Sequence, residues 1–234
     1  MNLKLVDYQG FIFDFYGTLV RDANSVPPMV DILRNLGYQS SELLEKVYEP
    51  DAFDGQQMPV LGRGCRAWLQ SNWERFCIAS GVPQSELRHV VSLLMHIRDS
   101  YRPEADASAN MVLSLLRSHG FKVGICSNWE SDIEVPLRQA GIYEYDAVVS
   151  SAEIGVRKPN RLIFEKVCEK ISVDPENVIF VGDNWNADIV GALHAGLTPV
   201  WIRNGKNSYF PEAILQFNDF TSFSRFLKLS FLKK

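Results

Sequence analysis

Residues 10–19 of the chain read GFIFDFYGTL, an apolar run that ends on one acid and breaks at a glycine. A short apolar run bounded by turn residues is typical of a buried strand, so we expect a strand over residues 10–14. In open α/β sheets, ligands bind outside the carboxyl ends of the strands, where the strand order reverses. The carboxylate of Asp14 is therefore predicted to face a ligand. An ordinary turn after a strand is the alternative interpretation of so short a motif.

Beyond residue 100 the chain alternates apolar runs of strand length with amphipathic runs of helix length. This alternation is typical of βαβ units and a parallel sheet. It predicts an α/β fold, a Rossmann-like parallel sheet with helices on both faces. The expected strands cover residues 121–126, 146–150, 177–182 and 197–202. The expected helices cover residues 105–119, 131–140, 160–171 and 186–195, and a short run at 213–217 and an amphipathic segment at 221–232 complete the domain.

Residues 22–102 interrupt the alternation with helix-period stretches rich in Leu, Val, Trp and Glu, and they contain no convincing strand. They predict a helical insert in a core domain that consists of residues 1–21 and 103–234. Pro27-Pro28 and Arg102-Pro103 restrict the backbone where the chain leaves and re-enters the core. We therefore expect hinges at these two places.

Composition limits the classes of function. The 234 residues are 46% hydrophobic, enough to bury a sizeable core. A net charge of −4 offers no basic surface for nucleic acid or for anionic membranes, so a small anionic substrate would need local charges. Without a membrane-length apolar stretch or a leader-like N-terminus, a cytoplasmic protein is expected. The cysteines lack metal-ligand or redox spacing, so buried thiols are expected for Cys65, Cys77, Cys126 and Cys168.

Two further motifs carry polar groups at predicted strand or helix ends. Residues 123–128 read VGICSN, and Ser127 and Asn128 offer a hydroxyl and an amide able to hold an oxyanion. Capping of the following helix is the alternative interpretation. Residues 155–159 read GVRKP, and Lys158 lies just before a predicted helix, where its ammonium group suits phosphate. A solvated surface lysine is the alternative there.

The fourth motif, residues 178–188, reads VIFVGDNWNAD. It delivers Asp183 to the end of a predicted strand and Asp188 into the first turn of a helix. Mg²⁺ is commonly held by one or two carboxylates with waters and phosphate oxygens, so Asp14 and Asp183 on neighbouring strands are candidates to share an ion. A favourable charge at a helix start is the alternative explanation for Asp188.

Taken in order, the four motifs resemble the haloacid dehalogenase superfamily of hydrolases. That family's pattern is an Asp-x-Asp-Gly-Thr strand end, a Ser or Thr strand end, a Lys-Pro and a Gly-Asp-x-x-x-x-Asp. The similarity spans most of the chain. The position of the insert is similar to the subfamily with a helical cap, which implies that residues 22–102 form a cap domain that closes over the strand ends and selects the substrate.

The resemblance implies a role for each motif residue. Asp14 would be a nucleophile that forms a covalent aspartyl intermediate, which water then hydrolyses. Ser127 and the backbone amide of Asn128 would bind the transferred group, and Lys158 would neutralise the charge gathered around Asp14. The remaining residues of the nucleophile's loop are Gly17 and Thr18.

The resemblance also implies a magnesium site. Its ligands would be Asp14, the main-chain carbonyl of Tyr16 and Asp183, with Asp188 bracing the site. Tyr16, however, stands where phosphatases of the family carry a second aspartate that protonates the leaving group and then activates water. The unperturbed pKa of tyrosine is about 10, too high for an effective base near neutral pH.

Tyrosine at this position is similar to the true L-2-haloacid dehalogenases, which use no metal and whose halide leaving group needs no proton. Those dehalogenases carry Ser and Asn in the last motif, whereas this chain keeps Asp183 and Asp188. Carboxylates beside Asp14 without a cation would repel one another. We therefore expect a Mg²⁺-dependent phosphatase of a small phosphorylated metabolite, with a metal-independent dehalogenase as the alternative.

A non-catalytic binding protein that kept the fold is a third interpretation. A protein that had lost its catalytic function would be expected to change at several catalytic positions. The chain keeps the motif residues Asp14, Thr18, Lys158 and Asp183. The oligomeric state is expected to be a monomer or a homodimer.

The insert offers its own candidates. Arg63 and Arg66 are candidates to clamp an anionic substrate, with solvent-facing arginines as the alternative. If the insert supplies the missing acid, the candidates are Glu42, Glu45, Asp51 and Asp54.

Overall fold

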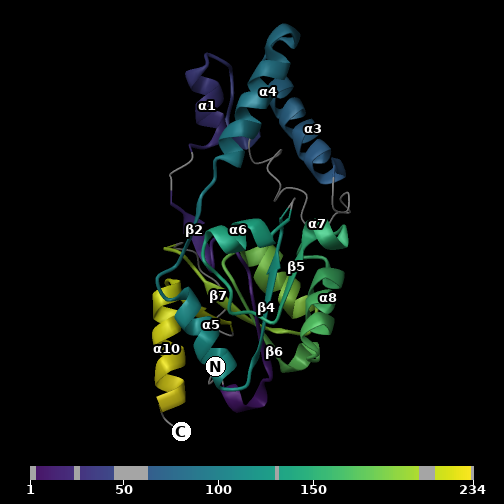
Figure 1. Cartoon of the computed structure of the whole chain (residues 1–234). Coiled ribbons are helices and arrows are strands. Elements are labelled where there is room, and N and C mark those ends of the chain that lie inside the picture. Colours follow the sequence, from purple (N-terminus) through teal and green to yellow (C-terminus); the bar gives the residue numbers. More distant parts are fainter. Residues whose placement is uncertain (1–3, 24–26, 45–62, 130–131, 206–213, 233–234) are drawn as a thin grey trace.

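A six-stranded parallel sheet forms the centre of the molecule, in the order β5-β4-β1-β6-β7-β8 (Figure 1). The computed structural model describes residues 4–23, 27–44, 63–129, 132–205 and 214–232. The chain builds the sheet from β1 to β4 and β5, then crosses back to β6 on the other side of β1, so the strand order reverses beside β1. The strands are β1 (Gly10–Phe13), β4 (Lys122–Ser127), β5 (Ala147–Ser150), β6 (Val178–Gly182), β7 (Thr198–Ile202) and β8 (Leu215–Phe217).

Helices cover both faces of this sheet, which confirms the predicted α/β class. Along β1, Phe11 and Phe13 belong to one apolar cluster and Ile12 to another, because successive side chains of a strand point to opposite faces. Burial of one such side chain stabilises the fold by about 1.5–3 kcal/mol. The first face is covered by α5 (Ala109–Ser118), α6 (Glu134–Gln139) and α10 (Phe220–Leu232), and the second by α8 (Arg161–Ile171) and α9 (Gly191–His194).

The predicted helix over residues 186–195 has two parts, a π-helical turn, η4 (Trp185–Val190), followed by α9. The expected helix over 105–119 begins only at Ala109, because the residues before it form a strand. Three short helical elements were not predicted, since so few residues show no hydrophobic period. They are η1 (Leu5–Asp7), α7 (Ser151–Ile154) and η3 (Pro175–Asn177).

Among the described residues between 22 and 102, three helices pack around an apolar core of their own, which includes Leu33, Phe76 and Leu94. Figure 1 shows them beyond one end of the sheet. We call α1, α3 and α4 together the helical segment. Their bounds are α1 (Met29–Asn35), α3 (Arg63–Ala79) and α4 (Gln84–Asp99).

Two short strands flank the expected insert, and Asp22 is the only described residue of the range 22–102 that lies in one of them. β2 (Val20–Asp22) pairs antiparallel with β3 (Pro103–Ala105), with Asp22 opposite Pro103, so a strand crosses the expected domain boundary. Proline is tolerated as the first residue of a strand, where its missing N–H breaks no ladder. Three residues are too few to show alternation in the sequence. The ribbon includes Pro103 of one expected hinge, whereas Pro27-Pro28 lies outside it, and the division into core and insert stays a prediction.

Two smaller expectations can be compared with the structure. Cys77, Cys126 and Cys168 are free and buried, as predicted, whereas the side chain of Cys65 lies outside the described part of the chain. No helix among the described residues has both the length and the apolar content needed to cross a membrane.

Candidate active site

The carboxyl ends of β4, β1 and β6 lie side by side, because these strands are neighbours in the sheet. Asp14 directly follows β1, and its backbone N–H donates to the carbonyl of Val181 at 2.9 Å, so the residue is held by the adjacent strand. Ser127 ends β4, and Asp183 follows β6. The structure thus brings together the strand ends that the sequence indicated.

Lys158 reaches into this cluster from the loop before α8. Its Nζ donates to Oδ1 of Asp14 at 2.7 Å, to Oδ1 of Asp188 at 2.6 Å and to the carbonyl of Cys126 at 3.1 Å. The side chains of Lys158, Asp14 and Asp188 are 2%, 8% and 1% exposed. Charge-assisted hydrogen bonds are short and strong in so dry a place. The solvated surface lysine is thereby excluded for Lys158.

The charges of the cluster do not balance. Asp14, Asp183 and Asp188 each offer a carboxylate oxygen, and these oxygens lie within 4.8 Å of one another. Burial is the main cause that raises the pKa of Asp14; the attraction of Lys158 opposes it, the charges of Asp188 and Asp183 add to it, and the net pKa is about 8. For Lys158, burial lowers the pKa, but the carboxylates of Asp14 and Asp188 outweigh it, and the net shift is upward. Three carboxylates around one ammonium group leave an excess of negative charge.

A hard divalent cation fits this donor set. Mg²⁺ prefers carboxylate and carbonyl oxygens, and only oxygen donors converge here besides the ammonium of Lys158. Asp188 already accepts from Lys158 through Oδ1 and from the backbone N–H of Asn184 through Oδ2, at 2.9 Å. A bracing role therefore suits Asp188, with Asp14 and Asp183 as the carboxylates for an ion. A Cβ on Gly182 would overlap the Asp188 side chain, so only glycine fits there.

Gly17 lies directly against the carboxylate of Asp183. Its φ is +88°, and an added Cβ would lie 2.6 Å from Oδ1 of Asp183. The Gly17 carbonyl accepts from Nδ2 of Asn204 at 2.6 Å, which fixes the loop. The close approach and the positive φ both require glycine.

A substitution at Gly17 tests the close approach to Asp183 separately from the positive φ. We expect Gly17→Ala to lose at least about 10²-fold in kcat/KM, because misplacing a catalytic group by about 1 Å can cost that much. Gly37→Ala is the matched control, since Gly37 has a φ of +90° and nothing within 4 Å of an added Cβ. Both variants should lose similar stability in urea unfolding. Equal activity of the two variants would contradict the importance of the contact with Asp183.

Asn128 holds the loop that carries Lys158. Its Oδ1 accepts from the backbone N–H of Lys158 at 2.7 Å, and its Nδ2 donates to the Lys158 carbonyl at 3.1 Å. This pair of bonds replaces the capping role considered for its side chain. Ser127 is 2% exposed, and the buried hydroxyl of Thr18 has no hydrogen-bond partner among the described residues. A polar ligand at the strand ends would satisfy such a group.

Two residues at the end of β7 also hold the site, and the sequence did not reveal them. Nε1 of Trp201 donates to the carbonyl of Asp183 at 3.0 Å, and Asn204 binds Gly17 as described. Both act on main-chain atoms, which leave no residue pattern in the sequence. The Asn204-Gly205 pair indicated at most a turn.

A cavity of about 630 Å³ lies beside the strand ends and reaches the helical segment. Tyr16, which is 50% exposed, lines it together with Tyr101, Trp129 and Trp73. Burial first, and then the charges of Asp22 and Asp183, raise the pKa of Tyr16 above its ordinary value. Its hydroxyl therefore stays protonated near neutral pH.

The remaining candidates of the insert are exposed to solvent or lie outside the described residues. Arg66 is exposed and forms a two-pronged ion pair with Asp99 on α4, at 2.5 and 3.2 Å. Glu42 is exposed. The side chain of Arg63 and the residues Glu45, Asp51 and Asp54 lie outside the described part of the chain.

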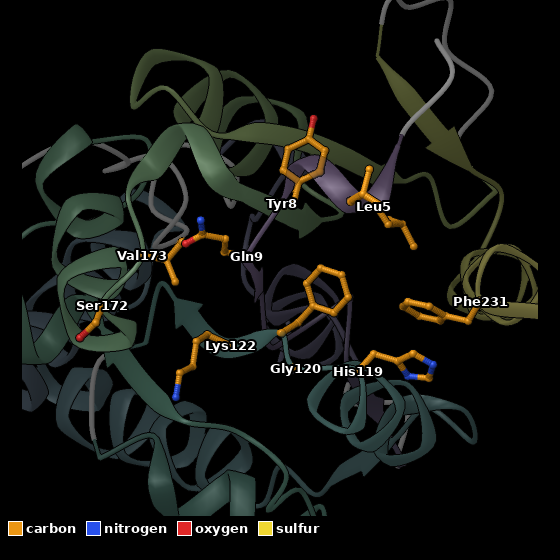
Figure 2. A pocket seen from close by; sticks show the side chains of 11 residues that line it. Leu5, Tyr8, Gln9, His119, Gly120, Lys122, Ser172, Val173 and Phe231 are labelled. Atoms are coloured by element: carbon orange, nitrogen blue, oxygen red, sulfur yellow. The ribbon is translucent and has the colours of Figure 1, made fainter. Parts of the chain in front are cut away.

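A second cavity, of about 530 Å³, lies at the opposite, amino end of the strands (Figure 2). Gln9, Lys122 and Val173 line it, next to the starts of β1, β4 and β6. Its described lining includes none of the predicted site residues.

Comparison with known proteins decides the family. The family model described as haloacid dehalogenase-like hydrolase matches residues 8–196. The chain belongs to this family of hydrolases. Membership in a family of hydrolases favours an enzyme over a non-catalytic binding protein.

Relatives of two reaction classes match the hydrolase. It is 36% identical over 105 residues to a glyceraldehyde 3-phosphate phosphatase of Methanothermobacter thermautotrophicus, covering 42% of each chain. It therefore spans less than half the length of this phosphatase. It is 27% identical over 222 residues to an (S)-2-haloacid dehalogenase of Pseudomonas fluorescens, covering 87% of this chain and 88% of that one. The structure of an L-2-haloacid dehalogenase shares the fold, with a TM-score of 0.68, 22% identity and coverage of 94% of this chain and 99% of that one.

Proposed function

We propose that this hydrolase is a Mg²⁺-dependent phosphatase of a small phosphorylated metabolite and works through a covalent intermediate on Asp14. The observation that carries the proposal is the excess of carboxylates in the cluster. Asp14 and Asp188, both buried, share the ammonium group of Lys158, and the half-buried Asp183 adds a third carboxylate to the cluster. Like charges held so close need a further cation to ionise together.

The ion would be held by Asp14, Asp183 and the main-chain carbonyl of Tyr16, with Asp188 as the brace. When bound, Mg²⁺ supplies positive charge against the oxygens of the phosphoryl group. The carboxylate arrangement supports this assignment because the protein already supplies donors to both oxygens of Asp188.

The first step uses the residues at the strand ends. A carboxylate oxygen of Asp14 attacks phosphorus, and the bond between phosphorus and the leaving oxygen breaks with its electron pair on that oxygen. Lys158 keeps Asp14 oriented through the 2.7 Å bond and balances its charge. The Ser127 hydroxyl and the backbone N–H of Asn128 would donate to the phosphoryl oxygens, with Thr18 and Gly17 shaping the loop. Positioning and charge stabilisation of this kind supply most of the catalysis in phosphoryl transfer.

The second step is the hydrolysis of the acyl phosphate. Water attacks phosphorus, which releases inorganic phosphate and restores the Asp14 carboxylate. The raised pKa of Tyr16 makes its phenol a poor base for this water. We therefore expect the intermediate to be hydrolysed slowly and to accumulate.

We also propose that residues 22–102 act as a cap over the site. The cavity is lined both by residues next to the sheet, such as Tyr16, and by residues of the helical segment, such as Trp73. A lid of this kind excludes water from the reacting groups. Arg63 and Arg66 as substrate clamps, a monomeric or homodimeric state and a cytoplasmic location stay predictions.

A metal-independent L-2-haloacid dehalogenase is the second candidate. Two observations favour it, namely Tyr16 in place of an acid and the long similarity to the dehalogenase of P. fluorescens. A halide ion leaves without a proton, so this reaction loses nothing in its first step by having tyrosine at this position. The retained Asp183 and Asp188 count against it.

Turnover measurements separate the two candidates. We expect phosphate release from phenyl phosphate and acetyl phosphate that needs Mg²⁺ and stops when a chelator removes it. L-2-chloropropionate should release no chloride under either condition. Chloride release that persists with the chelator would instead establish the dehalogenase.

A further inference from the structure

The cavity that Tyr16 lines has an aromatic wall, and this wall begins in the loop that follows Asp14. Tyr16 lies two positions after Asp14, and the rings of Tyr16 and Tyr101 are 5.5 Å apart at 71°. The ring of Trp129 lies 6.0 Å from that of Tyr101. These three residues come from the loop after β1, the segment before β3 and the loop after β4. They form a continuous surface suited to the face or edge of a planar ring.

Polar hydrogens in the wall and in the neighbouring lining of the cavity have no acceptor among the described residues. The hydroxyl of Tyr101 and the indole N–H groups of Trp129 and Trp73 are buried and have no hydrogen-bond partner among the described residues. Native structures rarely leave such groups unpaired. Because these donor atoms are buried, a ligand would reach them only after a shift of the rings, and the lining as it stands matches the apolar face or edge of a planar ring.

The chemistry at position 16 restricts the leaving group independently. With tyrosine there, that position has no carboxyl group to protonate the departing oxygen. The pKa of a phenol is about 10, whereas that of water, which an alkyl alcohol resembles, is about 16. A phenol oxygen therefore leaves as an anion far more readily than an alkoxide.

We propose that the substrate is the phosphate monoester of an aromatic hydroxyl group, with its ring seated on the wall formed by Tyr16, Tyr101 and Trp129. The proposal rests on the phosphatase function and names its substrate class. Asp14 forms the new bond to phosphorus, the bond from phosphorus to the aryl oxygen breaks, and the aryloxide takes a proton from solvent. Water then releases phosphate from Asp14, so one water is consumed for each ester.

Three phosphate compounds test the two halves of this inference separately. Phenyl phosphate has the ring and the phenol leaving group, benzyl phosphate has the ring but an alkoxide leaving group, and acetyl phosphate has a good leaving group but no ring. With Mg²⁺ present, we expect benzyl phosphate to show a low KM and a low kcat, and acetyl phosphate a high KM. Phenyl phosphate should exceed both in kcat/KM by at least about tenfold, since the ring contact and the leaving group each contribute.

Variants locate the ring. Tyr101→Leu should raise the KM for phenyl phosphate about fivefold and lower its kcat/KM relative to that for acetyl phosphate, because an aromatic contact is lost. A second variant, Trp129→Leu, should raise the KM for phenyl phosphate in the same way. It keeps the test valid if Tyr101→Leu does not fold. Tyr143→Leu is the control, since Tyr143 is exposed and lies outside the described lining of the cavity.

The outcomes are distinct for the two proposals. If benzyl phosphate is hydrolysed as fast as phenyl phosphate, or if the KM for phenyl phosphate is unchanged in both folded variants, the aryl phosphate proposal is wrong. The proposed phosphatase function would still stand after either result. No Mg²⁺-dependent phosphate release from any of the three compounds would overturn the proposed function itself.

Discussion

Asp14→Asn protein should fold normally and lose at least about 10³-fold in kcat/KM, because removal of a nucleophile leaves only the catalysis from binding and charge stabilisation. The amide oxygen can still accept from Nζ of Lys158, and one of three crowded carboxylates is gone. We therefore expect the free energy of unfolding to change by less than about 1 kcal/mol. Steady-state kinetics and urea unfolding measure the two effects.

Asp31→Asn is the control for this variant. Asp31 is exposed on α1 and pairs only with Arg34 among the interactions described. Its replacement should leave kcat/KM unchanged. If Asp14→Asn kept its activity within about tenfold of the unaltered protein, the nucleophile would have to be another group.

Lys158→Met should lose both activity and stability. The substitution leaves the buried carboxylates of Asp14 and Asp188 without the ammonium group that now lies 2.7 and 2.6 Å from them. Breaking a buried ion pair from one side costs about 3–5 kcal/mol, because the remaining charge is uncompensated. Urea unfolding should show this loss, and phosphate release should fall to background.

Two further proteins make this result interpretable. Lys166→Met removes an equally charged side chain from an exposed pair with Glu169 and should leave unfolding unchanged. The double variant Lys158→Met/Asp188→Asn should recover part of the lost stability, since one uncompensated charge is removed. If the Lys158→Met variant were as stable as the unaltered protein, the buried carboxylates would not need the ammonium group of Lys158 for stability.

The strand-end acids could be predicted because their position follows from topology. Alternating strands and helices build a parallel sheet, and the carboxyl ends of its strands share one edge. Asp14 and Asp183 end adjacent strands and therefore had to meet. The fold and the meeting of Asp14 with Asp183 thus follow from local patterns and topology, whereas the role of Asp188 in the site was implied by the family resemblance.

The supporting contacts depend on tertiary packing and could not be predicted. Trp201 and Asn204 bind main-chain carbonyls, so neither partner is marked by a residue type. The ribbon of β2 and β3 is too short to show a period in the sequence. The aromatic wall joins Tyr16, Tyr101 and Trp129 from three distant segments. Its substrate preference could be inferred only once these rings lay together.

The identity of the group attached to Asp14 during turnover tests the central claim most directly. Because Tyr16 is a poor base for the second step, the intermediate should accumulate with phenyl phosphate and Mg²⁺. We would quench the reaction in acid within the first turnover, digest the protein and weigh the peptide that contains Asp14. We expect one phosphoryl group on that peptide and none in the Asp14→Asn variant. An unmodified peptide, or an ester formed only from L-2-chloropropionate, would contradict it.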